Sequence, residues 1–428
     1  MEANILKRIF FDEHSHWERF KDKYGARIRP VVLKEIEKFR GCGDPENGFK
    51  LFVCEGCHHV RKVPYRCKGR FCTTCSVGES EEWSRLLSED VLQVNHRHVI
   101  FTVDEGLRDI FLLHRHLLKI FMDEAARLLV DYFQKKIKVT PGIIVGLHTF
   151  GARINFNPHV HILVTMGGMT KTGEWKGYDF LPFEMLRKQW QTIVLKLIRK
   201  ELTVAEKKPI QSKLQKAFSD NGKGFYVHAP KQKGNVKKQL QYIGRYIRRP
   251  AIGLNRIEEY DGQSVSFAYT DKVDGRKKIE MLSVEEFISR LIRHIPDEQF
   301  KMIRHYGMYA RRIKTLCKKL LNEWQKKARR WIIKVKKTLR RQTWRERVIA
   351  SGKKDPLLCP KCESFYEYKG EVCLESGEWQ IKVALCQNTR NYLKRVIDYF
   401  ASKQTSKKEK EEKYRLGISE LAMYSMFV

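Results

Sequence analysis

Two periods of hydrophobic and polar positions run along the chain, and each period predicts its own type of element. Residues 5–39 and 107–136 carry apolar side chains at the three- and four-residue spacing of amphipathic helices. Residues 79–93 and 183–200 are further helix candidates, whereas residues 98–103 are expected to form a strand. The pattern therefore predicts a chain that mixes helices with strands.

The most informative alternation lies at residues 157–164, where two histidines, His159 and His161, flank one apolar residue. Side chains two apart on a strand share a face, so both imidazoles are expected to point the same way. Residues 143–150 are a second strand candidate, and they carry His148. The residues between the two strands can turn the chain, so we expect antiparallel pairing that brings all three histidines together.

Three imidazoles on one face predict a metal site, because neutral imidazole is a common ligand of divalent ions. The alternative is a structural histidine pair among the 14 histidines of the chain.

A helix is predicted at residues 236–249, and it carries Tyr242 and Tyr246 four residues apart on one face. Pro250 ends this helix. The two tyrosines are either a reactive pair or amphipathic residues that pack inward. The cations that surround them are Lys237, Lys238, Arg245, Arg248 and Arg249.

Charge narrows the class of partner. The chain has 428 residues, enough for two or three domains, and its 84 Lys and Arg outnumber 50 Asp and Glu, giving a net charge of +34. A surplus spread along the chain predicts a polyanionic partner, most simply nucleic acid. No apolar run approaches the length of a membrane span, and residues 1–10 lack a signal-peptide pattern. We therefore expect a cytoplasmic protein with no membrane partner.

Eleven cysteines in a cytoplasmic protein favour metal binding over disulfides. Two Cys-x-x-Cys pairs, Cys54 with Cys57 and Cys72 with Cys75, predict one structural zinc ion held by four thiolates. Spare ligand candidates for a second zinc ion are Cys42, Cys67, His58 and His59.

Cations lie among these cysteines and also dominate the chain after residue 311. Such cations either contact DNA or form a solvated face. The candidates for DNA contact are Arg66, Lys68 and Arg70, and later Lys326, Lys327, Arg329 and Arg330. Beyond them, Cys359 and Cys362 form half of a zinc knuckle, which Cys373 and Cys386 could complete. Residues 401–415 are expected to be disordered.

A metal face of three histidines together with a two-tyrosine helix suits one reaction. A tyrosine attacks a DNA phosphodiester while the metal polarises a non-bridging oxygen, which leaves a phosphotyrosyl adduct and a free 3′ hydroxyl. The chain contains neither a Walker loop nor a Gly-x-Gly-x-x-Gly motif.

At these residues the chain resembles the HUH-type rolling-circle transposases of bacterial insertion sequences, the insertion sequence ninety-one type with a two-tyrosine motif. The resemblance is carried by Asn157 to His161, by Tyr242 to Tyr246 and by the block Arg304 to Gly307, and it covers most of the chain. The cysteines at residues 42–75 resemble the zinc-binding domain of that family.

The resemblance implies an α+β fold: an HUH palm with a central antiparallel sheet flanked by helices. An N-terminal helical and zinc-binding domain at residues 1–90, a catalytic domain at 91–310 and a basic helical C-terminal region at 311–428 are expected. The implied cofactors are Mg²⁺ or Mn²⁺ for catalysis and Zn²⁺ for structure. The implied partner is DNA, as single-stranded or hairpin element ends and a target site in the bacterial nucleoid. The oligomeric state stays open.

Two alternatives remain at the sequence level. One is a plasmid relaxase or replication initiator with the same chemistry, against which the N-terminal zinc module and the absence of a helicase argue. The other is a non-catalytic zinc protein that binds nucleic acid, which would have no use for the histidines and tyrosines together.

Overall fold

The computed structural model describes residues 4–69, 71–92, 94–229, 251–271, 274–327, 340–350 and 354–402. The chain divides into two compact units, each built from separated segments. Unit 1 comprises Met1–Ile36 and Gly69–Arg341, and unit 2 comprises Glu37–Lys68 and Gln342–Val428. This division differs from the three consecutive domains expected from the sequence, because strands at opposite ends of the chain pair with each other inside unit 2.

Unit 1 contains a five-stranded antiparallel sheet that is built around two long central strands. Its order is β12 (Ile303–Gly307), β4 (Gly142–Phe150), β5 (Phe156–Thr165), β3 (His96–Thr102) and β8 (Val227–His228). Every neighbouring pair in this sheet is antiparallel. The predicted pairing of the two histidine-bearing strands is therefore confirmed, as is the α+β class.

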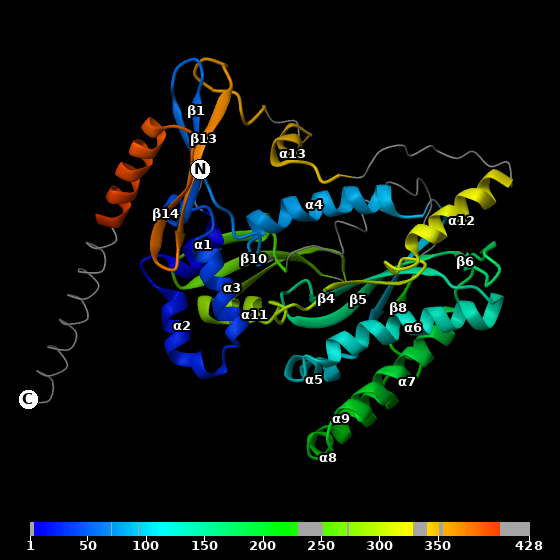
Figure 1. Cartoon of the computed structure of the whole chain (residues 1–428). Coiled ribbons are helices and arrows are strands. Elements are labelled where there is room, and N and C mark those ends of the chain that lie inside the picture. Colours follow the sequence, from blue (N-terminus) through cyan, green and yellow to red (C-terminus); the bar gives the residue numbers. More distant parts are fainter. Residues whose placement is uncertain are drawn as a thin grey trace, which may run out of the picture. The chain divides into compact units, whose positions relative to one another are not determined.

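Helices cover one face of this sheet (Figure 1). They are α5 (Arg108–Leu113), α6 (Leu117–Ile137), α7 (Phe183–Glu201) and α9 (Gln211–Ser219), with α6 beside α7. Strand positions at intervals of two point toward these helices and are almost fully buried. These positions are Val99, Phe101, Ile143, Val145, Leu147, Val160, Ile162 and Val164.

The intervening strand residues point to the opposite face, where a second and smaller core forms. Ile144 and Leu163 pack there against Leu321 of α12 (Lys314–Lys327) and against residues at the end of α4 (Thr73–Asp90). Because sheet side chains alternate, all three candidate histidines belong to this second face.

The remaining elements of unit 1 flank the central sheet. Ser283 caps α11 (Val284–Ile292) by accepting the N–H of Glu286 at 3.2 Å. The short hairpin is formed by β6 (Gly167–Met169) and β7 (Trp175–Gly177). The other elements are α1 (Ile5–Phe11), α2 (His16–Tyr24), α3 (Pro30–Arg40), which runs into unit 2, α8 (Val204–Lys207), β9 (Ile257–Tyr260), β10 (Ser264–Thr270), β11 (Lys277–Ser283) and α11 (Val284–Ile292).

Unit 2 contains a four-stranded antiparallel sheet made from both of its segments. Its order is β14 (Glu378–Ala384), β13 (Tyr366–Glu375), β1 (Gly48–Cys54) and β2 (Val60–Pro64). A helix at residues 387–402 and the short α13 (Trp344–Ala350) complete the unit. Its main apolar core is small and consists of Phe49, Leu51, Val372, Leu393 and Phe400.

Among the described residues, every helix is too short or too polar to traverse a lipid bilayer.

Candidate metal centre and DNA-contact residues

Three histidines meet on the second face of the central sheet. His148 of β4 lies directly opposite His159 of β5 in the strand register, and His161 follows two residues later on the same face. The ring of His148 lies 5.4 Å from that of His159 and 4.4 Å from that of His161, measured between centroids. One ligand nitrogen from each ring lies within 4.8 Å of the other two, which is close enough for a shared metal ion.

A backbone carbonyl fixes the orientation of His159. The Nδ1 atom of this ring lies 2.7 Å from the carbonyl oxygen of Asn157. Because a carbonyl can only accept, Nδ1 donates, and the lone pair of the neutral ring lies on Nε2. A metal-binding histidine usually has this arrangement, in which the second ring nitrogen donates to a fixed acceptor.

A fourth histidine, His98 of β3, fixes the orientation of the His161 ring. Its Nε2 lies 2.9 Å from Nδ1 of His161, and the two rings stack at 5.1 Å. Burial lowers the pKa of His98 to about 4, with smaller contributions from His228 and His159. The ring is therefore neutral near pH 7, so its Nε2 can accept from His161 and leave the Nε2 of His161 to a metal.

Sequence reasoning missed His98. It lies 61 residues before His159 on a strand that the sequence does predict. No spacing motif links it to the His-x-His pair, because the link is made by the pairing of β3 with β5. The available signal was a histidine at a position that alternates with the buried Val99 and Phe101.

The turn between β4 and β5 is held in place by three side chains from residues 256–294. The Nη1 atom of Arg290 donates to the carbonyl of Arg153 at 3.1 Å, and Nε2 of His294 donates to the carbonyl of Ile154 at 2.9 Å. Arg256 contacts the carbonyl of Ala152. These bonds fix the ends of the strands that carry His148 and His159.

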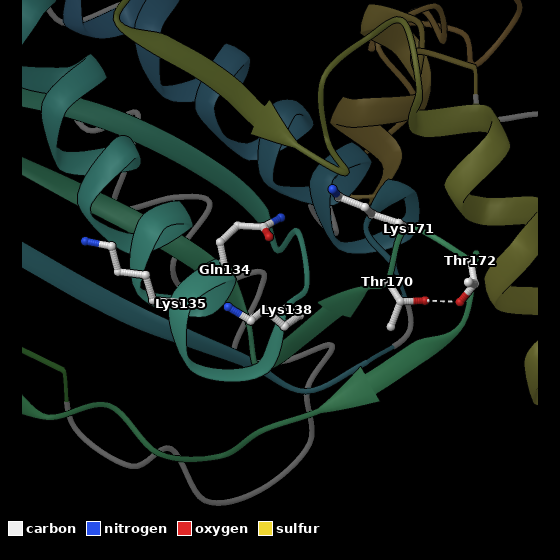
Figure 2. A pocket seen from close by; sticks show the side chains of 6 residues that line it. All are labelled: Gln134, Lys135, Lys138, Thr170, Lys171 and Thr172. Atoms are coloured by element: carbon white, nitrogen blue, oxygen red, sulfur yellow. Dashed lines mark hydrogen bonds between the residues drawn. The ribbon is translucent and has the colours of Figure 1, made fainter.

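A basic hollow of about 630 Å³ lies at the other end of β4. Figure 2 shows Lys135 and Lys138 at the end of α6, and Lys171 on the turn between β6 and β7. Gln134, Thr170 and Thr172 complete its lining, and the two threonine hydroxyls bond at 2.8 Å. Met169, next to this turn, pairs with Thr140 just before β4, so about 26 Å of extended chain separates the hollow from His148.

The cysteines are grouped differently from the prediction of one ion held by Cys54, Cys57, Cys72 and Cys75. The sulfur atoms of Cys54 and Cys57 lie with those of Cys359 and Cys362, all within 4.8 Å. The reason is the pairing of β1 with β13, in which Cys54 lies opposite Tyr366 and so next to the C-terminal cysteine turn.

The other candidate zinc ligands form two local pairs. Within unit 2, the N–H of Cys67 donates to the sulfur of Cys42 at 3.4 Å. In unit 1, Cys72 is the N-cap of α4 and Cys75 lies in its first turn. In the C-terminal region, Cys373 is buried on β13 and Cys386 is exposed. Neither joins a metal-ligand group among the described residues. The expectation that they could complete the C-terminal zinc knuckle is therefore wrong.

Several predicted residues lie outside the described part of the chain. These are the tyrosines Tyr242 and Tyr246 and the cations Arg70, Lys237, Lys238, Arg245, Arg248, Arg249, Arg329 and Arg330. The structure places the backbone of Lys326 and Lys327 at the end of α12 but does not describe their side chains. Arg66 and Lys68 are described, and both are exposed.

The fold and the site define an α+β protein with a three-histidine cluster on a central antiparallel sheet, and the comparisons give the family. A family described as a putative transposase matches residues 142–317, which include β4, β5 and β12. A family described as a transposase zinc-binding domain matches residues 13–103. The chain therefore belongs to the insertion-sequence transposases that carry this zinc-binding domain.

Two curated relatives share most of the chain. The transposase for insertion sequence element IS801 from Pseudomonas savastanoi pv. phaseolicola is 29% identical over 319 residues, which cover 72% of this chain and 77% of that protein. The putative transposase y4qJ from Sinorhizobium fredii is 27% identical over 318 residues, which cover 69% of this chain and 79% of that protein. No solved structure matches the chain.

Proposed function

We propose that this transposase nicks and joins single-stranded DNA at insertion-sequence ends by rolling-circle chemistry, through a 5′-phosphotyrosyl intermediate. The observation that carries this proposal is the meeting of His148, His159 and His161 on paired strands, with ligand atoms within 4.8 Å. A three-imidazole set leaves further coordination positions for substrate oxygens, as a catalytic ion requires.

The three histidines would hold Mg²⁺ or Mn²⁺. An ion bound there supplies positive charge beside a non-bridging oxygen of the scissile phosphate. The protein supplies orientation: the Asn157 carbonyl and His98 each engage an Nδ1 atom, which makes Nε2 the atom that His159 and His161 would offer to the ion.

The nucleophiles would be Tyr242 and Tyr246. A tyrosine oxygen forms a bond to phosphorus, the bond from phosphorus to the 3′ oxygen breaks, and the departing 3′ oxygen takes up a proton. The adduct conserves the energy of the phosphodiester, so a later 3′ hydroxyl can displace the tyrosine and join the strands. Two tyrosines would allow two sequential cleavages.

The zinc-binding domain would contain a further ion, to which Cys72 and Cys75 at the start of α4 would contribute two thiolates. The match to a transposase zinc-binding domain at residues 13–103 includes both cysteines. Cys72→Ser should remove one zinc ion per chain, and an unchanged zinc content in the purified variant would contradict this role of Cys72.

DNA would be bound largely through the phosphate backbone, and this binding would hold the protein at the bacterial nucleoid. In unit 2, Arg66 and Lys68 are exposed. In unit 1, the hollow lined by Lys135, Lys138 and Lys171 would offer three ammonium groups to a DNA strand. The net charge of +34 favours association with any polyanion. The cations at residues 237–249 and 326–330 belong to the same proposal.

The test is to incubate the full chain and Mg²⁺ with single-stranded oligonucleotides that carry the element ends, and then to separate the products under denaturing conditions. A protein–DNA adduct is expected with the wild-type chain and not with His159→Ala. His116→Ala, which changes an exposed histidine before α6, is the matched control and should form the adduct. Binding of DNA without any adduct would instead favour a non-catalytic zinc protein.

A further inference from the structure

Two Cys-x-x-Cys turns from opposite ends of the chain meet within unit 2. Cys54 and Cys57 lie on the turn that joins β1 to β2, and Cys359 and Cys362 lie just before β13. The sulfur of Cys54 is 3.4 Å from that of Cys362, and the sulfur of Cys57 is 3.6 Å from that of Cys359. These pairs are separated by 308 and 302 residues of sequence.

The two turns have the same backbone geometry. The residue after each second cysteine, His58 or Glu363, is left-handed, with φ of 55° and 56°. Its N–H donates to the carbonyl of the first cysteine, at 3.1 Å for His58 and 2.9 Å for Glu363. Two unrelated segments therefore build the same tight turn, each of which presents two sulfur atoms toward the other.

The spacing of the sulfur atoms fits a tetrahedral ion and does not fit disulfides. A zinc–sulfur bond of about 2.3 Å places the sulfur atoms of a tetrahedron about 3.8 Å apart, whereas a disulfide bond is about 2.05 Å long. The observed separations of 3.4 and 3.6 Å lie near the tetrahedral value. A four-thiolate set also selects a soft ion such as Zn²⁺ over the hard ions proposed for the histidines.

We infer that Cys54, Cys57, Cys359 and Cys362 bind one structural Zn²⁺ ion, which joins the N-terminal hairpin of β1 and β2 to the C-terminal segment before β13. Cys359 and Cys362 thus belong to one metal-dependent module together with Cys54 and Cys57 of the zinc-binding domain. Unit 2 has a small apolar core, so such a cross-link between distant segments has a large effect on its order. This inference does not rest on the proposed DNA chemistry.

The first test uses the wild-type full chain and counts reactive thiols by alkylation and mass spectrometry. Cys57, Cys362 and Cys386 are all exposed, so Cys386 serves as an internal control on the same molecule. In zinc-loaded protein, Cys57 and Cys362 should react at least about tenfold more slowly than Cys386, because their thiolates are bound to metal. A chelator, without any reductant, should bring both to the rate of Cys386.

Two results would overturn the inference. One is alkylation of Cys362 as fast as that of Cys386 in zinc-loaded protein. The other is protection that a reductant removes and a chelator does not, which would indicate disulfides.

The second test measures zinc content in variants of the full chain. Cys359→Ser and Cys362→Ser should each lose one zinc ion per chain, whereas Cys386→Ser should lose none. The control is conservative because Cys386 accepts the N–H of Thr389 near the start of the last helix, a role that serine can fill. Full zinc content in Cys359→Ser and Cys362→Ser would contradict the site.

Discussion

The hydrogen bond from His161 to His98 gives the sharpest prediction about the candidate metal centre. Replacing His98 by leucine fills a similar volume and removes the acceptor that fixes the His161 ring. The two ring nitrogens are 2.9 Å apart, and His161 is only 1% exposed, so solvent cannot easily replace the lost partner. We expect the variant to bind Mn²⁺ more weakly and to form less phosphotyrosyl adduct.

The expected loss of Mn²⁺ affinity follows from the role of His98 as the residue that orients a metal-binding histidine. Loss of an orienting partner of a metal-bound histidine weakens metal binding or activity by about 10- to 100-fold. This corresponds to about 1.4 to 2.8 kcal/mol of binding free energy. Isothermal titration of Mn²⁺ into the His98→Leu protein measures it directly, and adduct yield at saturating Mn²⁺ separates metal binding from chemistry.

A matched control lies two residues earlier on the same strand. His96 is equally buried on the same face, but its Nε2 bonds to the hydroxyl of Tyr309 at 2.6 Å. His96→Leu should lose stability as His98→Leu does, because each removes a buried hydrogen bond, yet it should bind Mn²⁺ normally. His98→Gln offers an amide in place of Nε2 and should recover part of the affinity. Equal Mn²⁺ affinity in the His96→Leu and His98→Leu proteins would refute the positioning role.

Three further predictions concern catalysis, affinity and stability. The double variant Tyr242→Phe with Tyr246→Phe should bind single-stranded DNA but form no covalent adduct on denaturing gels, and an adduct in this variant would place the nucleophile elsewhere. Binding of single-stranded DNA should weaken with salt by about 0.7 log units per log unit of salt for each phosphate contact, and a flat titration would show that the cations do not hold the strand. Burial raises the pKa of Glu280, but the guanidinium groups of Arg153 and Arg290 outweigh it and lower the pKa overall. The ion pairs of Glu280 with these two arginines therefore stabilise the fold at neutral pH, and this stabilisation is lost as the carboxylate becomes protonated below about pH 4.3. Urea unfolding should show a smaller loss on acidification in Glu280→Gln than in the wild type, and identical acid dependence would contradict the role of this carboxylate.

Local sequence was enough to determine the elements that carry the histidines. Strand periodicity depends on neighbouring residues only, so the alternation around His159 and His161 fixed both the strand and the shared face of the two rings. The short connection from β4 made antiparallel pairing the simplest arrangement, and His148 lies opposite His159 as predicted. The prediction succeeded because all three residues lie within one hairpin.

Only the tertiary structure decided which distant residues complete each site. His98 reaches His161 because β3 pairs with the far side of β5, and Cys359 and Cys362 reach Cys54 and Cys57 because β13 pairs with β1. A Cys-x-x-Cys turn specifies two ligands and says nothing about which other turn faces it. That choice depends on the pairing of strands about 300 residues apart, and so on the free energy of the folded sheet rather than on any local pattern.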